Sequence, residues 1–124
     1  MQKITRFGTA RRWSDVVIYG GVARWVEVAE DTSLLSGGQI DQVLRQIDAT
    51  LRQIGSDKSQ VLEVIIFLAD LAEMSLLNER WDAWVMEGHP PIRACLQVGL
   101  AGGCRVEMVV TAAVEATAPE VQES

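Results

Sequence analysis

The stretch VLEVIIFLA, residues 61–69, constrains the fold of this chain more than any other part of its sequence. Both alternating sets of its side chains are apolar, with Leu62, Val64, Ile66 and Leu68 on one side and Ile65 and Phe67 on the other. A strand with this pattern is buried on both faces of its sheet. The fold must therefore provide a cover for each of the two faces.

Residues 15–29, DVVIYGGVARWVEVA, predict a hairpin of two strands. The two β-rich runs flank Gly20-Gly21, and a two-residue Gly-Gly connection suits a turn that needs positive φ. A short additional strand is expected near residues 3–7. The polar residues after the hairpin, 30–38, predict a loop.

The hydrophobic period then changes to that of a helix. Over residues 39–54 apolar side chains recur at steps of three and four, which predicts one buried helical stripe. Ser36 is the expected N-cap of this helix. Gly55 follows its last apolar residue and is expected to stop it at the C′ position.

A second helix is predicted after the apolar strand, over residues 70–88. Asp70 and Glu73 have the spacing of a capping box, and Gly88 is the expected end of the helix. Its large aromatic side chains are expected to pack against the sheet, because aromatic residues dominate the area of protein cores.

The predicted element order is β-β-α-β-α-β-β, which gives an α+β fold with one mixed sheet. Right-handed crossovers place both helices on the same face of that sheet. The other face then stays bare, and another copy of the same chain is its simplest cover. We expect one domain over residues 1–114 and a frayed, polar tail over 115–124.

Charge and composition exclude several classes of partner. The 124 residues are 48% hydrophobic and 23% charged, as in one globular domain. The net charge of −6 repels phosphate backbones, so no nucleic-acid partner is expected. No apolar run reaches the ~18 residues of a membrane span. The start, MQKITRFGTARR, lacks the apolar core of a signal peptide, which predicts a cytoplasmic protein without a membrane partner.

The sequence also offers few metal ligands. Two cysteines and one histidine make neither a disulfide framework nor a cluster with zinc spacing. No glycine-rich loop has the spacing of a nucleotide site. We expect no metal and no cofactor.

Residues 89–110, HPPIRACLQVGLAGGCRVEMVV, place one arginine and one carboxylate inside two strands that are otherwise apolar. A hairpin turning near residues 99–103 would put Arg93, Cys95 and Glu107 on one face, with Cys95 roughly opposite Glu107. Arg93 and Glu107 would then be close enough to share one small ligand. A guanidinium binds carboxylates bidentately, so Arg93 is a candidate anchor for an acid. A salt bridge between subunits is the alternative reading.

These strands resemble the C-terminal signature of the Rid family, also called YjgF-like or endoribonuclease L-PSP-like. The matching residues are Pro91, Arg93 and Val98 in the first strand and Val106, Glu107 and Met108 in the second. The second helix is similar to the same family, with Asp70, Asn78, Trp81 and Trp84 in place. The stretches ARRWSDVVIYGG and WDAWV are most similar to a YoaB-like branch. The resemblance covers nearly all of residues 10–114.

The resemblance implies a chorismate-mutase-like fold that assembles as a homotrimer, with a central barrel and clefts between subunits. It implies that Arg93 binds the carboxylate of a small acid and that Glu107 positions or activates water. Deaminating members of the family convert 2-aminoacrylate and related enamines or imines into 2-keto acids and ammonia, without a metal. The expected ligand is therefore a small carboxylate of the 2-imino or 2-keto acid type.

Two positions depart from the family's pattern. Val26 or Glu27 falls where deaminating members carry a pocket serine, and Trp13-Ser14 stands in the region of a pocket tyrosine. Trp13 and Ser14 are candidate pocket-lining residues, and Cys95 is expected to share the cleft of the arginine.

Two functions stay open at this point. The chain hydrolyses reactive imines, or it binds small carboxylates without catalysis in a regulatory or protective role. Ribonuclease activity is disfavoured, because the chain is acidic and lacks paired histidines for phosphodiester chemistry.

Overall fold

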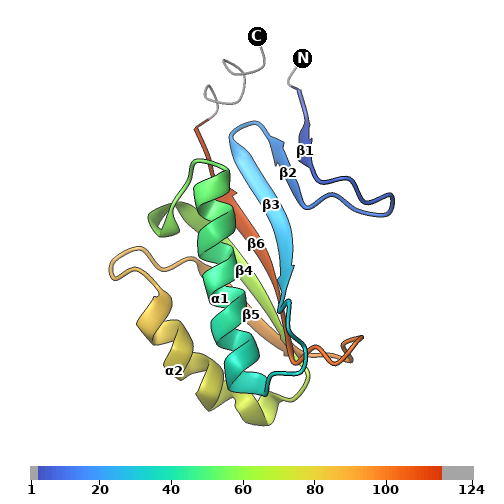
Figure 1. Cartoon of the computed structure of the whole chain (residues 1–124). Coiled ribbons are helices and arrows are strands. Elements are labelled where there is room, and N and C mark those ends of the chain that lie inside the picture. The colour runs from blue at the N-terminus through green and yellow to red at the C-terminus, as the bar shows by residue number, and fades with distance from the viewer. Residues whose placement is uncertain (1–2, 116–124) are drawn as a thin grey trace.

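A computed structural model of the chain describes residues 3–115, which form a six-stranded mixed sheet with two α-helices on one side of it (Figure 1). The elements are β1 (Thr5–Phe7), β2 (Val16–Tyr19), β3 (Val22–Val28), α1 (Ser36–Gln53), β4 (Val61–Leu68), α2 (Met74–Trp84), β5 (Ile92–Gln97) and β6 (Val106–Ala113). Short 3₁₀ turns, Lys58–Gln60 and Leu71–Glu73, precede β4 and α2. The predicted α+β class, the order of elements and the extra strand near residues 3–7 are confirmed.

The hairpin of β2 and β3 turns at the two glycines, as the sequence predicts. Gly20 has φ +60° and Gly21 has φ +79°. Positive φ at both central positions is the geometry of a type I′ turn, whose twist matches that of the flanking strands.

The α1 helix ends as predicted but begins differently. At its end, Gly55 has φ +75°, its N–H donates to the Arg52 carbonyl, and the Ser56 N–H donates to the Leu51 carbonyl. This pair of bonds is a Schellman motif. At its start, Ser36 is the first helical residue rather than the N-cap, and its hydroxyl accepts a hydrogen bond from Arg105 Nε.

The α2 helix is shorter than predicted. The Asp70 carboxylate caps the preceding 3₁₀ turn by accepting the Ala72 N–H, whereas the Glu73 side chain pairs with Arg105. The helix ends at Trp84, because the next residue, Val85, is extended with ψ +140°. Gly88 therefore lies in the loop that follows the helix.

The predicted hairpin of the last two strands is wrong. The strand order is β1-β2-β3-β6-β4-β5, so β4 lies between β5 and β6. It pairs in parallel with β5 through the α2 crossover and antiparallel with β6. The side chains of β6 that face the helices are fully buried, which suits a central strand, while β5 carries polar residues and takes the edge. Cys95 consequently lies opposite Ile66, and Glu107 lies opposite Phe67.

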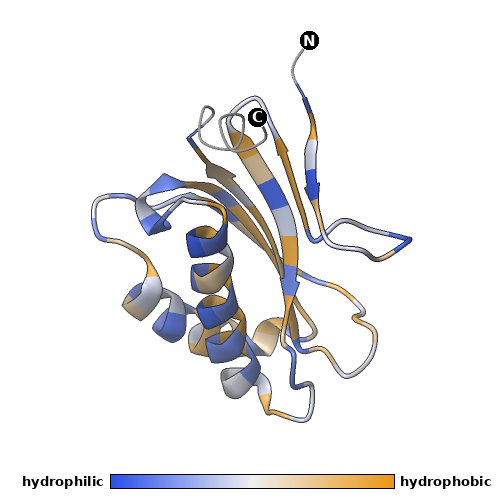
Figure 2. Ribbon diagram, turned by 45° about the horizontal axis from the view of Figure 1, so that its top comes forward, coloured by the Kyte–Doolittle hydropathy of each residue, from blue (hydrophilic) through white to orange (hydrophobic). Residues whose placement is uncertain are grey.

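Both faces of the sheet carry many apolar side chains, and the helices cover one of these faces. On this covered face the central side chains are fully buried, among them Val64, Ile66, Met108 and Val110. On the opposite, open face Tyr19 is 52% and Val26 54% exposed. Figure 2 shows apolar residues recurring along the strands, and no helix of residues 3–115 lies over the open face. This is the bare face that the sequence predicts.

The C-terminal end of β6 closes against the first hairpin, where the Val114 N–H donates to the Gly21 carbonyl. The predicted tail, 115–124, lies outside the described residues except for Glu115. Neither α-helix within residues 3–115 has the length and apolar character needed to cross a membrane.

Candidate functional site

Arg93 lies on the edge strand β5, and its side chain points to the covered face. Its Cα partner in β4 is Val64, which is fully buried on that face. The guanidinium carbon sits 5.4 Å from the centroid of the Trp81 ring of α2. Within residues 3–115, no carboxylate lies within ion-pair distance of Arg93. The guanidinium is therefore held on an aromatic face while its N–H groups stay available to an anion.

Trp81 and Trp84 stand about one turn apart on α2 and contact each other, with ring centroids 5.3 Å apart and planes tilted by 48°. Both rings are buried and belong to the hydrophobic core, as the sequence predicts for large aromatic side chains. Trp84 also donates from Nε1 to Asp48 of α1 at 3.0 Å, and the Lys58 ammonium lies 5.3 Å from its ring centroid. Each tryptophan thus makes one cation–π contact: Trp84 with Lys58, and Trp81 with Arg93.

Cys95 shares the covered face with Arg93, two residues further along β5. Burial raises the pKa of its half-buried thiol, and the nearby Arg93 charge offsets part of that rise. The thiol is consequently protonated at neutral pH. His89 is exposed in the loop that enters β5. No group of three or more histidine, cysteine or acidic side chains in residues 3–115 gathers as a metal site requires.

Glu107 lies on the open face, opposite Val28 of β3 and Phe67 of β4. The register places Arg93 level with Val110, three residues from Glu107 along β6 and two strands away. Strand geometry converts this offset into about 10 Å along the strands and about 10 Å across them. Since the two side chains also point to opposite faces, the prediction that they share one face of a single chain is wrong.

A cleft of about 550 Å³ opens beside β3, away from the β5 edge that carries Arg93. Both predicted lining residues, Trp13 and Ser14, contribute to it. It lies where β3 continues beyond its pairing with β2, between the loop that precedes β2 and the α1 helix. Further lining residues are Asp15, Val16, Trp25, Val26, Glu27, Val28, Thr50 and Gln53. Trp13 is 65% exposed, so one wall of the cleft is a largely solvated indole.

The structure distinguishes the two residues that fall near the family's serine position. Val26 points to the open face, where its Cα partner is Val109. Glu27 turns to the helices, and its carboxylate accepts hydrogen bonds from Trp25 Nε1 at 2.9 Å and Thr50 Oγ1 at 2.9 Å. Glu27 therefore ties β3 to α1, and Val26 supplies an apolar side chain without a hydroxyl to the open side of the cleft.

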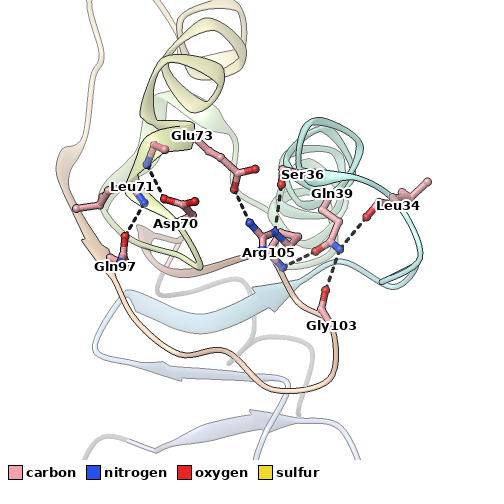
Figure 3. A network of polar contacts seen from close by, with 10 residues as sticks. Leu34, Ser36, Gln39, Asp70, Leu71, Glu73, Gln97, Gly103 and Arg105 are labelled. Carbon is pink, nitrogen blue, oxygen red and sulfur yellow. Dashed lines mark hydrogen bonds and ion pairs between the residues drawn. The ribbon is translucent and has the colours of Figure 1, made fainter.

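A buried amide holds the backbone of Arg105, the residue that precedes β6 and lies two residues before Glu107 (Figure 3). Gln39 is fully buried; its Oε1 accepts from the Arg105 N–H at 2.8 Å, and its Nε2 lies 3.1 Å from the Gly103 carbonyl. The Arg105 side chain in turn pairs with Glu73 at 3.1 Å. The sequence did not predict this network. The hydrophobic pattern identified Gln39 only as the first residue of a helix and gave no sign of its distant partners.

Comparison with known proteins identifies relatives along almost the whole chain. The family model described as Endoribonuclease L-PSP matches residues 3–114. The RutC family protein YoaB of Escherichia coli strain K12 is 41% identical over 112 residues, which cover 90% of this chain and 98% of that protein. A RutC family protein of Haemophilus ducreyi is 38% identical over 113 residues, covering 90% of this chain and 97% of its own.

Solved structures match the fold equally well. A crystal structure of an uncharacterized protein from Pseudomonas aeruginosa aligns with a TM-score of 0.87 at 39% identity, over 91% of this chain and 100% of that one. A member of the YjgF protein family from Neisseria meningitidis aligns with a TM-score of 0.85 at 38% identity, over 91% and 96%.

The mixed sheet with two helices on one face is thus a YjgF-like fold. The chain belongs to the Rid/YjgF family, whose model carries the L-PSP name. The family resemblance read from the sequence is confirmed.

Proposed function

We propose that this protein binds small carboxylates through Arg93. The observation that supports this most directly is the environment of the Arg93 side chain. It is half-buried, its guanidinium lies over the Trp81 ring, and it has no carboxylate partner within residues 3–115. A cation held in this way lacks a counter-ion, and a planar guanidinium offers two parallel donors to a carboxylate.

We propose further that the complete site is formed by two copies of the chain. Arg93 lies on β5, at one edge of the sheet. The cleft that Trp13 lines lies beside the C-terminal half of β3, and two strands, β6 and β4, separate β3 from β5. Glu107 is not a lining residue of the cleft, but it borders the cleft, because its Cα partner Val28 lines it. A neighbouring copy is therefore needed to bring Arg93 to this cleft.

A homotrimer with the open faces turned inward as a central barrel is the assembly we propose. Such packing removes the apolar side chains of the open face from water. It also places an edge strand of one copy beside the next, which covers unpaired backbone groups.

The proposed reaction is hydrolysis of a 2-imino acid. Arg93 holds the carboxylate, and Glu107 accepts a proton from a water that adds to the iminium carbon. The resulting carbinolamine takes that proton on nitrogen. Its C–N bond then breaks while Glu107 accepts the hydroxyl proton, and the released ammonia takes up this proton as ammonium, which leaves the 2-keto acid and the Glu107 carboxylate. No metal or redox partner enters this balance.

The second candidate is a carboxylate-binding protein without catalytic activity. Val26 and Glu27 favour it, because one of them falls where deaminating members of the family carry a serine and neither supplies a hydroxyl to the cleft. Both candidates need Arg93, and they differ only in whether Glu107 has a substrate to act on.

Calorimetric titration with pyruvate and benzoate tests the shared part. Arg93→Ala should weaken binding on the order of 100-fold, since two charge-assisted hydrogen bonds are lost. Arg93→Lys should weaken it about tenfold, because the charge stays but the fork is gone. Arg45→Ala removes the same charge from an exposed site on α1 and serves as the control. Equal affinity in all four proteins would overturn the proposal.

Release of ammonia from imines made in situ by an amino-acid oxidase then separates the two candidates. A panel from small to bulky aromatic imines suits a cleft lined by Trp13 and Val26. Glu107→Gln should keep carboxylate binding and lose the rate enhancement by ~10²-fold or more. If no imine is hydrolysed faster than in buffer while Arg93 still binds carboxylates, the protein is a binder.

A further inference from the structure

The carboxylate anchor of the proposed site rests on one aromatic ring. Arg93 Cζ lies 5.4 Å from the Trp81 centroid, inside the range in which a cation is attracted to a ring face. The Arg93 guanidinium makes no hydrogen bond or ion pair to a side chain in residues 3–115 that would hold it otherwise. Its orientation therefore depends on the indole.

Topology explains why these two residues meet. Trp81 is on α2 and Arg93 on β5, and α2 is the crossover that connects β4 to β5 in parallel (Figure 1). A right-handed crossover lays its helix over the two strands that it joins. The inward face of α2 consequently meets the inward side chains of the edge strand.

Trp84 is the natural comparison for Trp81. The two residues have the same type, lie on the same helix and are buried to a similar extent, at 9% and 6% exposure. Trp84 contacts Lys58 and donates to Asp48, neither of which belongs to β5. A purely structural role for both tryptophans predicts similar consequences when either is replaced.

We infer that Trp81 is a positioning residue for Arg93, holding the guanidinium over its ring so that the N–H fork is pre-organised for a carboxylate. This inference rests on the proposed function, in which Arg93 is the anchor. Pre-organisation of a long side chain lowers the entropy lost when a ligand binds. It also explains how an arginine without a counter-ion is retained on the helix side of the sheet, because the ring face supplies the missing negative potential.

The first measurement needs no ligand. In ¹⁵N NMR spectra of the full chain, the Arg93 Nε–Hε resonance should carry an upfield ring-current shift. That shift should persist in Trp81→Phe and Trp81→Tyr, disappear in Trp81→Leu, and be unchanged in Trp84→Phe. A resonance at the solvent-exposed position in the wild-type protein would overturn the inference.

The second measurement is the affinity for benzoate. Trp81→Leu should weaken binding roughly three- to tenfold, with Trp81→Phe and Trp81→Tyr in between, as expected for a cation–π contact. Trp84→Phe, the matched control, should bind like the wild type. In an Arg93→Ala background, Trp81→Leu should have no further effect, since it acts through the arginine.

The outcomes separate this inference from the proposed function. If Trp81→Leu and Trp84→Phe weaken benzoate binding equally, or neither does, while Arg93→Ala abolishes it, the positioning role is wrong and the anchor stands. If Arg93→Ala binds as well as the wild type, the anchor falls, and the NMR shift alone decides whether the ring orients the arginine. Should Trp81→Leu fail to fold, the graded Phe and Tyr variants still decide the outcome.

Discussion

Ile65 and Ile66 are neighbours on β4, and they lie on opposite faces of the same sheet. Ile66 is fully buried against the core beneath the helices, whereas Ile65 is half-buried among the open-face residues Val109 and Ala94. Both faces carry apolar side chains in β4 and β6, but the chain's own helices cover only one face. This difference indicates that one face stabilises the fold and the other is available for assembly.

The largest effect is expected from a charge placed on the open face. Val109 lies at the centre of that face, between Val26 and Ile65. Val109→Asp should convert an assembly of about three times 13.6 kDa into a single chain, because an unpaired carboxylate is costly to bury. Light scattering at micromolar concentration measures this mass.

The control for that variant is Ala49→Asp, which adds the same charge to an exposed position of α1. It should leave the mass unchanged, and far-UV circular dichroism should show both variants folded. A single-chain mass for the wild type, or an unchanged mass for Val109→Asp, would mean that the open face is not an interface.

The next effect compares the two isoleucines directly. Ile66→Ala should lower the free energy of unfolding by about 2–5 kcal/mol, as for other large-to-small changes in a packed core. Ile65→Ala should cost clearly less when both are measured by urea unfolding in the Val109→Asp background, where assembly does not contribute. Equal costs would indicate that both faces are part of the folding core of one chain.

A smaller effect is expected at the polar end of the covered face. Gln39→Leu leaves the Arg105 N–H and the Gly103 carbonyl without their partner, which should cost about 2 kcal/mol in unfolding free energy. Hydrogen exchange at the Arg105 amide should accelerate with it. Gln42→Leu, which removes an exposed bond to the Asp31 N–H, is the matched control and should cost less. If Gln39→Leu costs no more than its control, the network does not fix the start of β6.

The smallest effect concerns Cys95. Because burial raises the pKa of its thiol, the thiolate fraction near pH 8 is smaller than that of a free cysteine, and alkylation by iodoacetamide should be several-fold slower. Arg93→Ala removes a charge that lowers this pKa, so it should slow the reaction further. Rates in a Cys104→Ser background, compared with the urea-unfolded protein, measure both. Alkylation as fast as in urea would place the thiol outside the covered face.

Local sequence signals predicted the elements of this fold well. The Gly20-Gly21 turn, the stripe of α1 and its stop at Gly55 depend on neighbours a few residues apart, and all three are found. The apolar character of β4 on both sides also indicated a bare face. Such features could be predicted because they depend only on the hydrophobic periodicity and the turn-forming residues of one segment.

Long-range pairing could not be predicted in the same way. Alternation shows which residues of one strand share a face, but it does not show which strand lies beside it. In the structure β4 lies between β5 and β6. Its register with each of them places the side chains of Arg93 and Glu107 on opposite faces of the sheet. Gln39 shows the same limit, since its partners Gly103 and Arg105 lie 64 and 66 residues away along the chain.

The shared site can be tested most directly by mixing two defective variants. Arg93→Ala lacks the anchor, and Val26→Trp blocks the cleft with a bulky side chain, so neither should bind benzoate alone. If each site takes its arginine from one copy and its cleft from the next, random co-assembly at equal amounts should restore about one quarter of the wild-type sites. Calorimetric titration after joint unfolding and refolding counts these sites. No restored binding in mixtures that have demonstrably exchanged subunits would contradict a site built from two copies.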